Sequence, residues 1–221
     1  MSPAVGLADP VHGSQAVFRQ VLDAMSRPGR VHELPADLFA LPSRPALPLG
    51  SAAAAVLLTL CDGETALWWS PGPRLLQLQD WARFHAGVRW VEAVEEADFV
   101  GVRASALTPE LWSRLRPGSD VAPHTAATLI VEVDVLDALP EVPADPADAA
   151  PAHLTGEAVL TLQGPGIEHT ARLRVGGIAP EVWQARHDPS AIYPCGVDLL
   201  LCCGHRVAGL PRSTRLIGLD T

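Results

Sequence analysis

One stretch near the end of the chain, Cys195–His205 (CGVDLLLCCGH), gathers residue types that bind zinc or carry thiol redox chemistry. Within it, VDLLLCC is almost continuously apolar and lies between two glycines, which is typical of a strand covered on both faces. Successive side chains of a strand point to opposite faces, so Cys202 and Cys203 cannot converge on one ion. Cys195 would lie about 26 Å from Cys203 in an extended chain. We therefore interpret the stretch as a buried strand, with a metal or redox site as the alternative.

Two turns carry groups that could hold an anion. Leu210–Thr214 (LPRST) places an arginine and two hydroxyl groups after a predicted strand, and a guanidinium binds phosphate oxygens as a fork. The alternative is that Arg212 pairs with a carboxylate at the end of the sheet. Gln163–Ile167 (QGPGI) could expose backbone N–H groups to an anion, but such a turn also serves only to reverse the chain. Asp198 opens a buried strand and therefore needs a partner.

Two predicted helices each contribute one further polar candidate. Arg19 lies one helical turn before Asp23, so an exposed ion pair of small energetic effect is expected. His85 lies on the apolar side of its helix near the carboxyl end, where a dipole-stabilised or hydrogen-bonded histidine is expected rather than a catalytic base. The sequence has no nucleophile elbow, no His-Asp-Ser order and no HExxH motif, so we assign no catalytic residue.

The charged residues exclude several classes of protein. All 16 basic residues are arginine and the sequence contains no lysine. A Schiff-base lysine for pyridoxal phosphate (PLP) and the lysine of a P-loop are therefore both excluded. The formal net charge of -9 argues against nonspecific binding to nucleic acid or to an anionic membrane.

The start of the chain lacks the basic and apolar regions of a secretory signal. The longest apolar run, Ala52–Leu60, is too short to span a bilayer. We therefore expect a cytoplasmic protein, in which the four cysteines do not require disulfides.

Helical and strand patterns alternate along the chain, which predicts an α/β fold. The first helix is predicted to begin with Ser14 as its N-cap and to end before Pro28, and its predicted apolar stripe consists of Val17, Val21 and Met25 with Phe18 and Leu22. Further helices are predicted over 50–65, 74–87, 108–115 and 180–187. Strands are predicted over 65–69, 98–102, 128–136, 158–167, 171–178, 197–203 and 206–211. Because the later strands follow one another directly, we expect three layers with a mixed β-sheet flanked by helices.

The segment Pro140–Ala152 is rich in proline and alanine and is predicted to be a loop or linker. It could divide the chain into two domains. The segments after it are mostly strands, which alone would leave much of a sheet uncovered. We therefore expect one α/β domain over 1–221 with a surface loop at 140–152.

Taken together, six segments resemble the PhnH family, a subunit of the bacterial carbon–phosphorus lyase system. They occur in order over nearly the whole chain. The segments are FRQVLDAMSRPG (18–29), LLTLCDGET (57–65), RFH (83–85), PGSDVAPHTAATLI (117–130), LQGPGI (162–167), and YPCGVDLLL with GLPRST (193–201 and 209–214). Cys195 stands where the family usually has leucine, which favours the apolar interpretation of this cysteine.

The resemblance implies a fold like a degenerate PLP-dependent transferase domain that has lost its cofactor. It implies a homodimer that joins PhnG, PhnI and PhnJ in a core complex making ribose 1-methylphosphonate 5-triphosphate from ATP and methylphosphonate. The chain would be an accessory subunit in phosphonate catabolism and not catalytic by itself. Arg19, His85, Asp198 and Arg212 become candidate anion-binding or subunit-contact residues. The alternatives are a freestanding phosphate-ester or nucleotide enzyme that uses Arg212 and Asp198, and a cysteine-based metal or redox protein.

Overall fold

A computed structural model describes residues 5–39, 46–140, 156–186 and 193–221 of the chain. The helices are α1 (Pro10–Ser26), α2 (Ser51–Leu60), α3 (Leu75–Ala86), α4 (Pro109–Ser113) and α5 (Pro180–Arg186), with 3-10 turns at Val94–Glu96, Ala104–Ala106 and Pro123–Thr125. The strands are β1 (His32–Glu33), β2 (Ala66–Trp69), β3 (Arg89–Trp90), β4 (Phe99–Arg103), β5 (Thr128–Glu132), β6 (Leu136–Leu139), β7 (Glu157–Gln163), β8 (Ala171–Gly176), β9 (Asp198–Cys203), β10 (Arg206–Leu210) and β11 (Arg215–Asp220).

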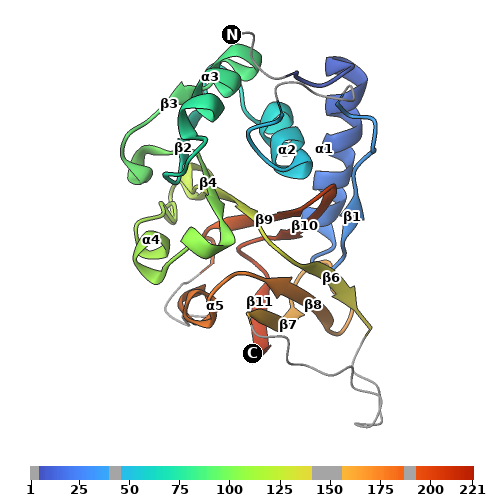
Figure 1. Cartoon of the computed structure of the whole chain (residues 1–221). Helices are drawn as coiled ribbons and strands as arrows, with labels where there is room; N and C mark the ends of the chain where they lie inside the picture. Colours follow the sequence, from blue (N-terminus) through green and yellow to red (C-terminus); the bar gives the residue numbers. More distant parts are fainter. Residues whose placement is uncertain (1–4, 40–45, 141–155, 187–192) are drawn as a thin grey trace.

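The strands form two sheets (Figure 1). The larger is seven-stranded with the order β1-β10-β9-β5-β4-β2-β3. Strands β3, β2, β4, β5 and β9 are mutually parallel, whereas β10 is antiparallel to β9 and β1 is antiparallel to β10. The smaller sheet, β11-β7-β8-β6, is antiparallel throughout. The prediction of an α/β fold with a mixed sheet flanked by helices is confirmed, but it did not foresee the second sheet.

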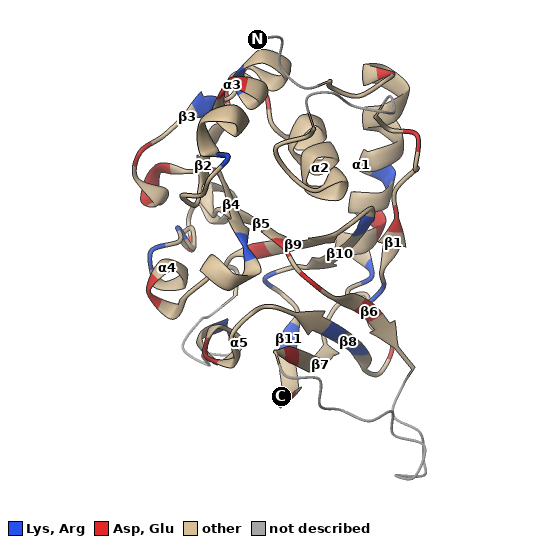
Figure 2. Ribbon diagram, in the orientation of Figure 1, with Lys and Arg blue, Asp and Glu red and all other residues tan. Residues whose placement is uncertain are grey.

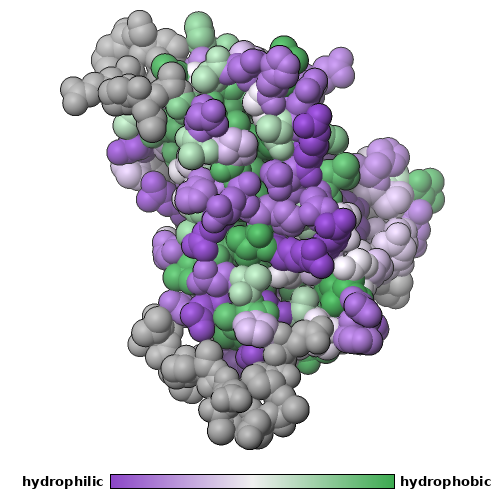
Figure 3. Space-filling view, turned by 90° about the vertical axis from the view of Figure 1, so that its right-hand side faces the viewer, coloured by the Kyte–Doolittle hydropathy of each residue, from purple (hydrophilic) through white to green (hydrophobic). Residues whose placement is uncertain are grey.

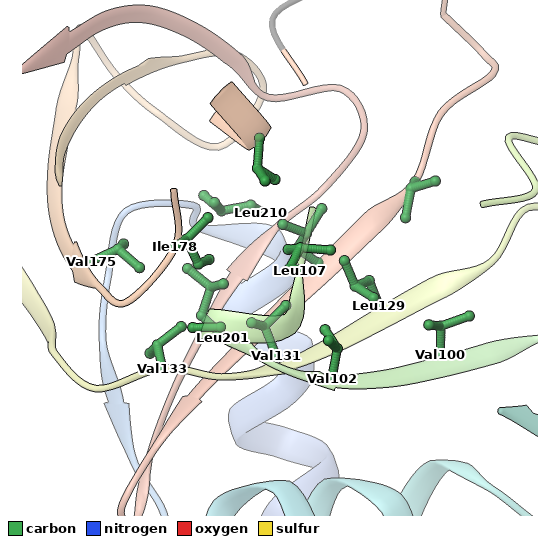
Figure 4. Close-up of a cluster of buried hydrophobic side chains, with 14 of the residues drawn as sticks. Val100, Val102, Leu107, Leu129, Val131, Val133, Val175, Ile178, Leu201 and Leu210 are labelled. Carbon is green, nitrogen blue, oxygen red and sulfur yellow. The ribbon is translucent and has the colours of Figure 1, made fainter. Parts of the chain in front are cut away.

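The large sheet is the middle of three layers. Helices α1, α2 and α3 cover one face, while the small sheet with α4 and α5 covers the other. Strand β9 shows the two-sided burial that its sequence predicts: Leu200 and Cys202 join the helical core, and Leu199 and Leu201 join the core against the small sheet. Figure 4 shows side chains of that second core, in which Leu201 of the large sheet lies between Val131 of the same sheet and Val175 of the small one. The two sheets are therefore held together by apolar packing.

The first helix begins earlier than its apolar stripe indicates. Its N-cap is Asp9, whose carboxylate accepts hydrogen bonds from the backbone N–H groups of Val11 and His12, with Pro10 at the first helical position. The prediction of Ser14 as the cap is therefore wrong. The prediction of Phe18 and Leu22 on the apolar stripe is also wrong, because they are 50% and 58% exposed and the buried side of the helix consists of Val17, Val21 and Ala24.

The structure tests two further sequence predictions, on the domain boundary and on membrane-spanning segments, only in part. Apart from Pro140, the predicted loop at 140–152 lies outside the described residues, so the single-domain boundary stays a prediction. Among the residues that are described, no helix is both long and apolar enough to cross a membrane.

Candidate functional site

Asp198 and Arg212 bind one another at the amino end of β9. The Asp198 carboxylate accepts hydrogen bonds from the backbone N–H of Arg212 at 2.7 Å and from its Nε and Nη2 groups. The two side chains are only 19% and 16% exposed. Asp198 therefore has the partner that a carboxylate at the start of a buried strand needs. The structure favours the interpretation of Arg212 as one half of an ion pair at the end of the sheet.

The pair also joins three loops. Arg212 Nη1 donates to the Pro123 carbonyl at 2.7 Å, and the backbone N–H of Gly196 donates to the Pro117 carbonyl at 2.8 Å. Gly196 has φ +133, and a Cβ there would lie 3.0 Å from Arg212 Cβ. The segment before β9, the loop before β5 and the turn after β10 are thus fastened at one point. Glycine at 196 allows the close approach of the first and last of these.

Arg186, the last residue of α5, is a second guanidinium beside this network. Its Nη2 donates to the carbonyls of Leu210 and Pro211, at 3.2 and 2.9 Å. Burial lowers the pKa of Arg186 to about 10, and the Asp198 carboxylate partly offsets that effect. The side chain therefore stays charged at neutral pH while its described hydrogen-bond partners are neutral carbonyls. No local pattern in the sequence marks this residue as functional, because it is simply the last residue of a short helix.

A cavity of about 760 Å³ lies against these groups, between α4, α5 and the turn after β10. We call it the arginine cavity. Arg186, Arg212 and Arg215 line it, and none of its described lining residues is acidic. Figure 2 shows basic residues on α5 and at β11, which lie on the same side of the large sheet. Arginines at a cavity wall without facing carboxylates are suited to holding an anion.

Thr214 is a further residue in the wall of the arginine cavity. Thr214 is 3% exposed, lines the cavity, and its Oγ1 has no hydrogen-bond partner among the described residues. The sequence motif LPRST had indicated an arginine with hydroxyls suited to phosphate. The structure brings Thr214 and Arg215 of this neighbourhood to the cavity, although Arg212 itself is mostly engaged by Asp198.

The other two predicted residues lie elsewhere. Arg19 is exposed on α1, and the expected pair with Asp23 is not formed, because Asp23 contacts Arg27 at 3.0 Å and His32 at 3.4 Å instead. His85 is partly buried on α3 with its ring against Trp81, at a centroid distance of 5.6 Å. The four candidates therefore do not form one site: only Asp198 and Arg212 meet.

The cysteines are separated, as the strand interpretation predicts. Cys202 is buried on the helical side of β9, whereas Cys203 packs against the opposite core. Cys195 lies outside the strand, and its Sγ is 3.5 Å from Asp120 Oδ1. Within the described parts of the chain, no group of three or more His, Cys, Asp or Glu residues could hold a metal ion.

We expect Cys61 and Cys202 to resist alkylation in the folded protein. Burial raises the pKa of Cys61 to about 12 and that of Cys202 further, so almost no reactive thiolate is present at pH 8. Treatment with iodoacetamide followed by peptide mass spectrometry should show modification at neither residue, whereas the same reaction in guanidinium chloride should modify both. Rapid modification of either cysteine without denaturant would contradict the structure.

A smaller depression lies at the carboxyl ends of β2, β4 and β5, where open α/β sheets commonly bind ligands. It has a volume of about 180 Å³ and is lined by Arg74, Arg103 and Glu132, among others. Glu132 Oε1 accepts a hydrogen bond from the Gly50 N–H at 2.6 Å, which fastens the start of α2 to β5. Because this depression is below the usual size of a ligand pocket, the arginine cavity is the stronger candidate.

Comparison with known proteins gives a match over nearly the whole chain. A family model described as bacterial phosphonate metabolism protein (PhnH) matches residues 5–217. The alpha-D-ribose 1-methylphosphonate 5-triphosphate synthase subunit PhnH of Rhizobium meliloti (strain 1021) is 32% identical over 212 residues, which cover 95% of this chain and 92% of that protein. The putative C-P lyase subunit protein HtxG of Stutzerimonas stutzeri is 36% identical over 205 residues, covering 91% and 85% of the two chains.

Proposed function

The chain belongs to the PhnH family of bacterial phosphonate metabolism proteins, and from this premise we propose that it is an accessory subunit in phosphonate catabolism. It would act with partner subunits of the carbon–phosphorus lyase system to make ribose 1-methylphosphonate 5-triphosphate from ATP and methylphosphonate. The observation that carries this proposal is the length of the match. A relative named as a subunit of that synthase aligns with 95% of the chain, and a second relative is named as a putative C-P lyase subunit.

The proposed partners are a second copy of this chain and the PhnG, PhnI and PhnJ subunits, in the cytoplasm. Helix α1 supports a subunit contact, because Val11, Phe18 and Leu22 lie on one side of it and are 62%, 50% and 58% exposed. Arg19 adjoins them and is exposed. Figure 3 shows the face that carries α1 and β1 as mainly hydrophilic with small hydrophobic patches. This mixture of apolar and polar surface is common in protein interfaces. His85 on α3 is a second candidate contact.

We propose that the chain works without PLP. Enzymes that use this cofactor hold it through a lysine, and this sequence has none. We also propose that the fold is like a degenerate PLP-dependent transferase domain that has lost its cofactor. This part of the proposal rests on the family resemblance alone.

The alternative of a freestanding phosphate-ester or nucleotide enzyme relied on Asp198 and Arg212 as working groups. Their mutual hydrogen bonds and the contact of Arg212 with Pro123 favour a structural role for both. The accessory-subunit proposal does not need either residue to touch a substrate.

The test is the native mass of the tagged chain, purified gently from its own host grown on methylphosphonate as sole phosphorus source. We expect a large assembly with companions in fixed stoichiometry. The companions are then identified by mass spectrometry, and growth on inorganic phosphate is the control in which they should not be induced. A bare homodimer, from cells shown to express the expected companions, would refute the proposal.

A further inference from the structure

We propose that the arginine cavity binds the phosphate or phosphonate group of a small organic molecule. The existence of an anion site follows from the contacts of the residues that line the cavity. The choice of a phosphorus oxyanion over other anions rests on the proposed function.

The charges of the cavity favour a dianion. Asp198 neutralises Arg212, but Arg186 donates only to main-chain carbonyls and Arg215 only to the neutral amide oxygen of Gln163, at 3.2 Å. Neither Arg186 nor Arg215 therefore forms an ion pair with a carboxylate among the described residues, although Asp198 also acts on Arg186 from a distance. A phosphate or phosphonate group brings up to two negative charges and three oxygens that accept hydrogen bonds.

Thr214 supplies an independent indication of a ligand. Thr214 lines the cavity, and its hydroxyl is buried and has no partner among the described residues. A buried hydroxyl without a partner destabilises a fold, so such a group calls for an explanation. A phosphoryl oxygen in the cavity would accept a hydrogen bond from Thr214 Oγ1 and would satisfy it.

The size and the remaining wall fit an organic phosphate. The volume of about 760 Å³ lies within the usual range of ligand pockets. Trp112, Leu115 and Ile217 add apolar surface beside the arginines. Such a wall suits a ligand with an uncharged organic part as well as an anionic end.

The test measures binding to the full-length chain by isothermal titration calorimetry, with methylphosphonate, inorganic phosphate and ATP as separate probes. We expect saturable binding of at least one probe, and the strongest of the three distinguishes a free phosphonate from a nucleotide phosphate. Thr214→Val keeps the shape of the side chain and removes only its hydroxyl. We expect it to weaken binding about tenfold or more, because the lost hydrogen bond is made to a charged group.

The same variant separates binding from folding. Because the hydroxyl has no described partner, Thr214→Val should leave the melting temperature unchanged or raise it. Thr161→Val, a matched change on β7 outside the lining of the cavity, should leave the affinity unchanged. Absence of saturable binding of all three probes, or wild-type affinity in Thr214→Val, would overturn the inference. Failure to find an assembly in the cell, with this binding pattern intact, would count against the proposed function alone.

Discussion

Replacing Gly209 by alanine is expected to destabilise the protein by about 3 kcal/mol and to lower its melting temperature by roughly 6–12 °C. Gly209 lies in β10 directly under α1. A Cβ added there would lie 2.7 Å from the carbonyl carbon and oxygen of Ala24, both of them main-chain atoms of the helix. Main-chain atoms cannot rotate away as a side chain can, so α1 must shift off the sheet. The helical core that contains Val17 and Val21 would loosen with it.

The measurement is thermal and urea unfolding followed by circular dichroism. Gly72→Ala is the matched control, because no atom lies within 4 Å of the position where its Cβ would be. We expect that variant to unfold close to the wild-type temperature. Equal stability of both variants would mean that α1 does not pack against β10 as closely as described.

This contact shows where the sequence stops being informative. The apolar stripe of α1 predicts that the helix packs on something, and the strand pattern of β10 predicts a partner sheet. Neither pattern tells which residue of the strand must be small, because the requirement comes from a helix far away in the chain. The early start of α1 is different: Asp9 followed by Pro10 is a strong start signal. The apolar stripe alone predicts a later start at Ser14, because the first turn of the helix has no apolar periodicity.

The second sheet was missed for a related reason. Strands β7 and β8 were predicted as strands, and this is confirmed; the structure pairs them with one another. Their apolar alternation shows that one face is buried but not against what, since a strand inside a mixed sheet and a strand in a separate packed sheet can look alike. Strand β6 carries the chain from one sheet to the other only a few residues after β5. No local pattern in this short segment marks the change of sheet.

In the candidate site, too, some features can be predicted from the sequence and others need the structure. That Asp198 needs a partner follows from its place at the start of an apolar strand, but no pattern in the sequence identifies Arg212 as that partner. Arg186 could not be found, because its role depends on where α5 ends relative to the turn after β10. Thr214 stood in a motif that suggested phosphate, but only its burial without a described partner distinguishes it from any other hydroxyl.

Removing the Asp198 carboxylate is the second change with a large expected effect. Asp198→Ala should lower the free energy of unfolding by about 2–4 kcal/mol, because Arg212 is left largely buried with its charge uncompensated. The loss should be larger than the loss from breaking the ion pair between Arg114 and Glu95, whose side chains are 55% and 50% exposed. Urea unfolding of Asp198→Ala and Glu95→Ala gives this comparison directly.

A double-mutant cycle with Arg212→Ala then decides what the pair is for. If the pair fastens the three loops, the double variant should be little less stable than Asp198→Ala alone, because removing Arg212 also removes the uncompensated charge. Additive losses would mean that each residue is held mainly by other contacts.

The cycle also bears on the freestanding-enzyme alternative. A pair that is strongly coupled in the folded protein is committed to holding β9 against the turn after β10. Its residues would then influence any ligand in the arginine cavity by positioning Arg186 and Thr214 rather than by reacting themselves.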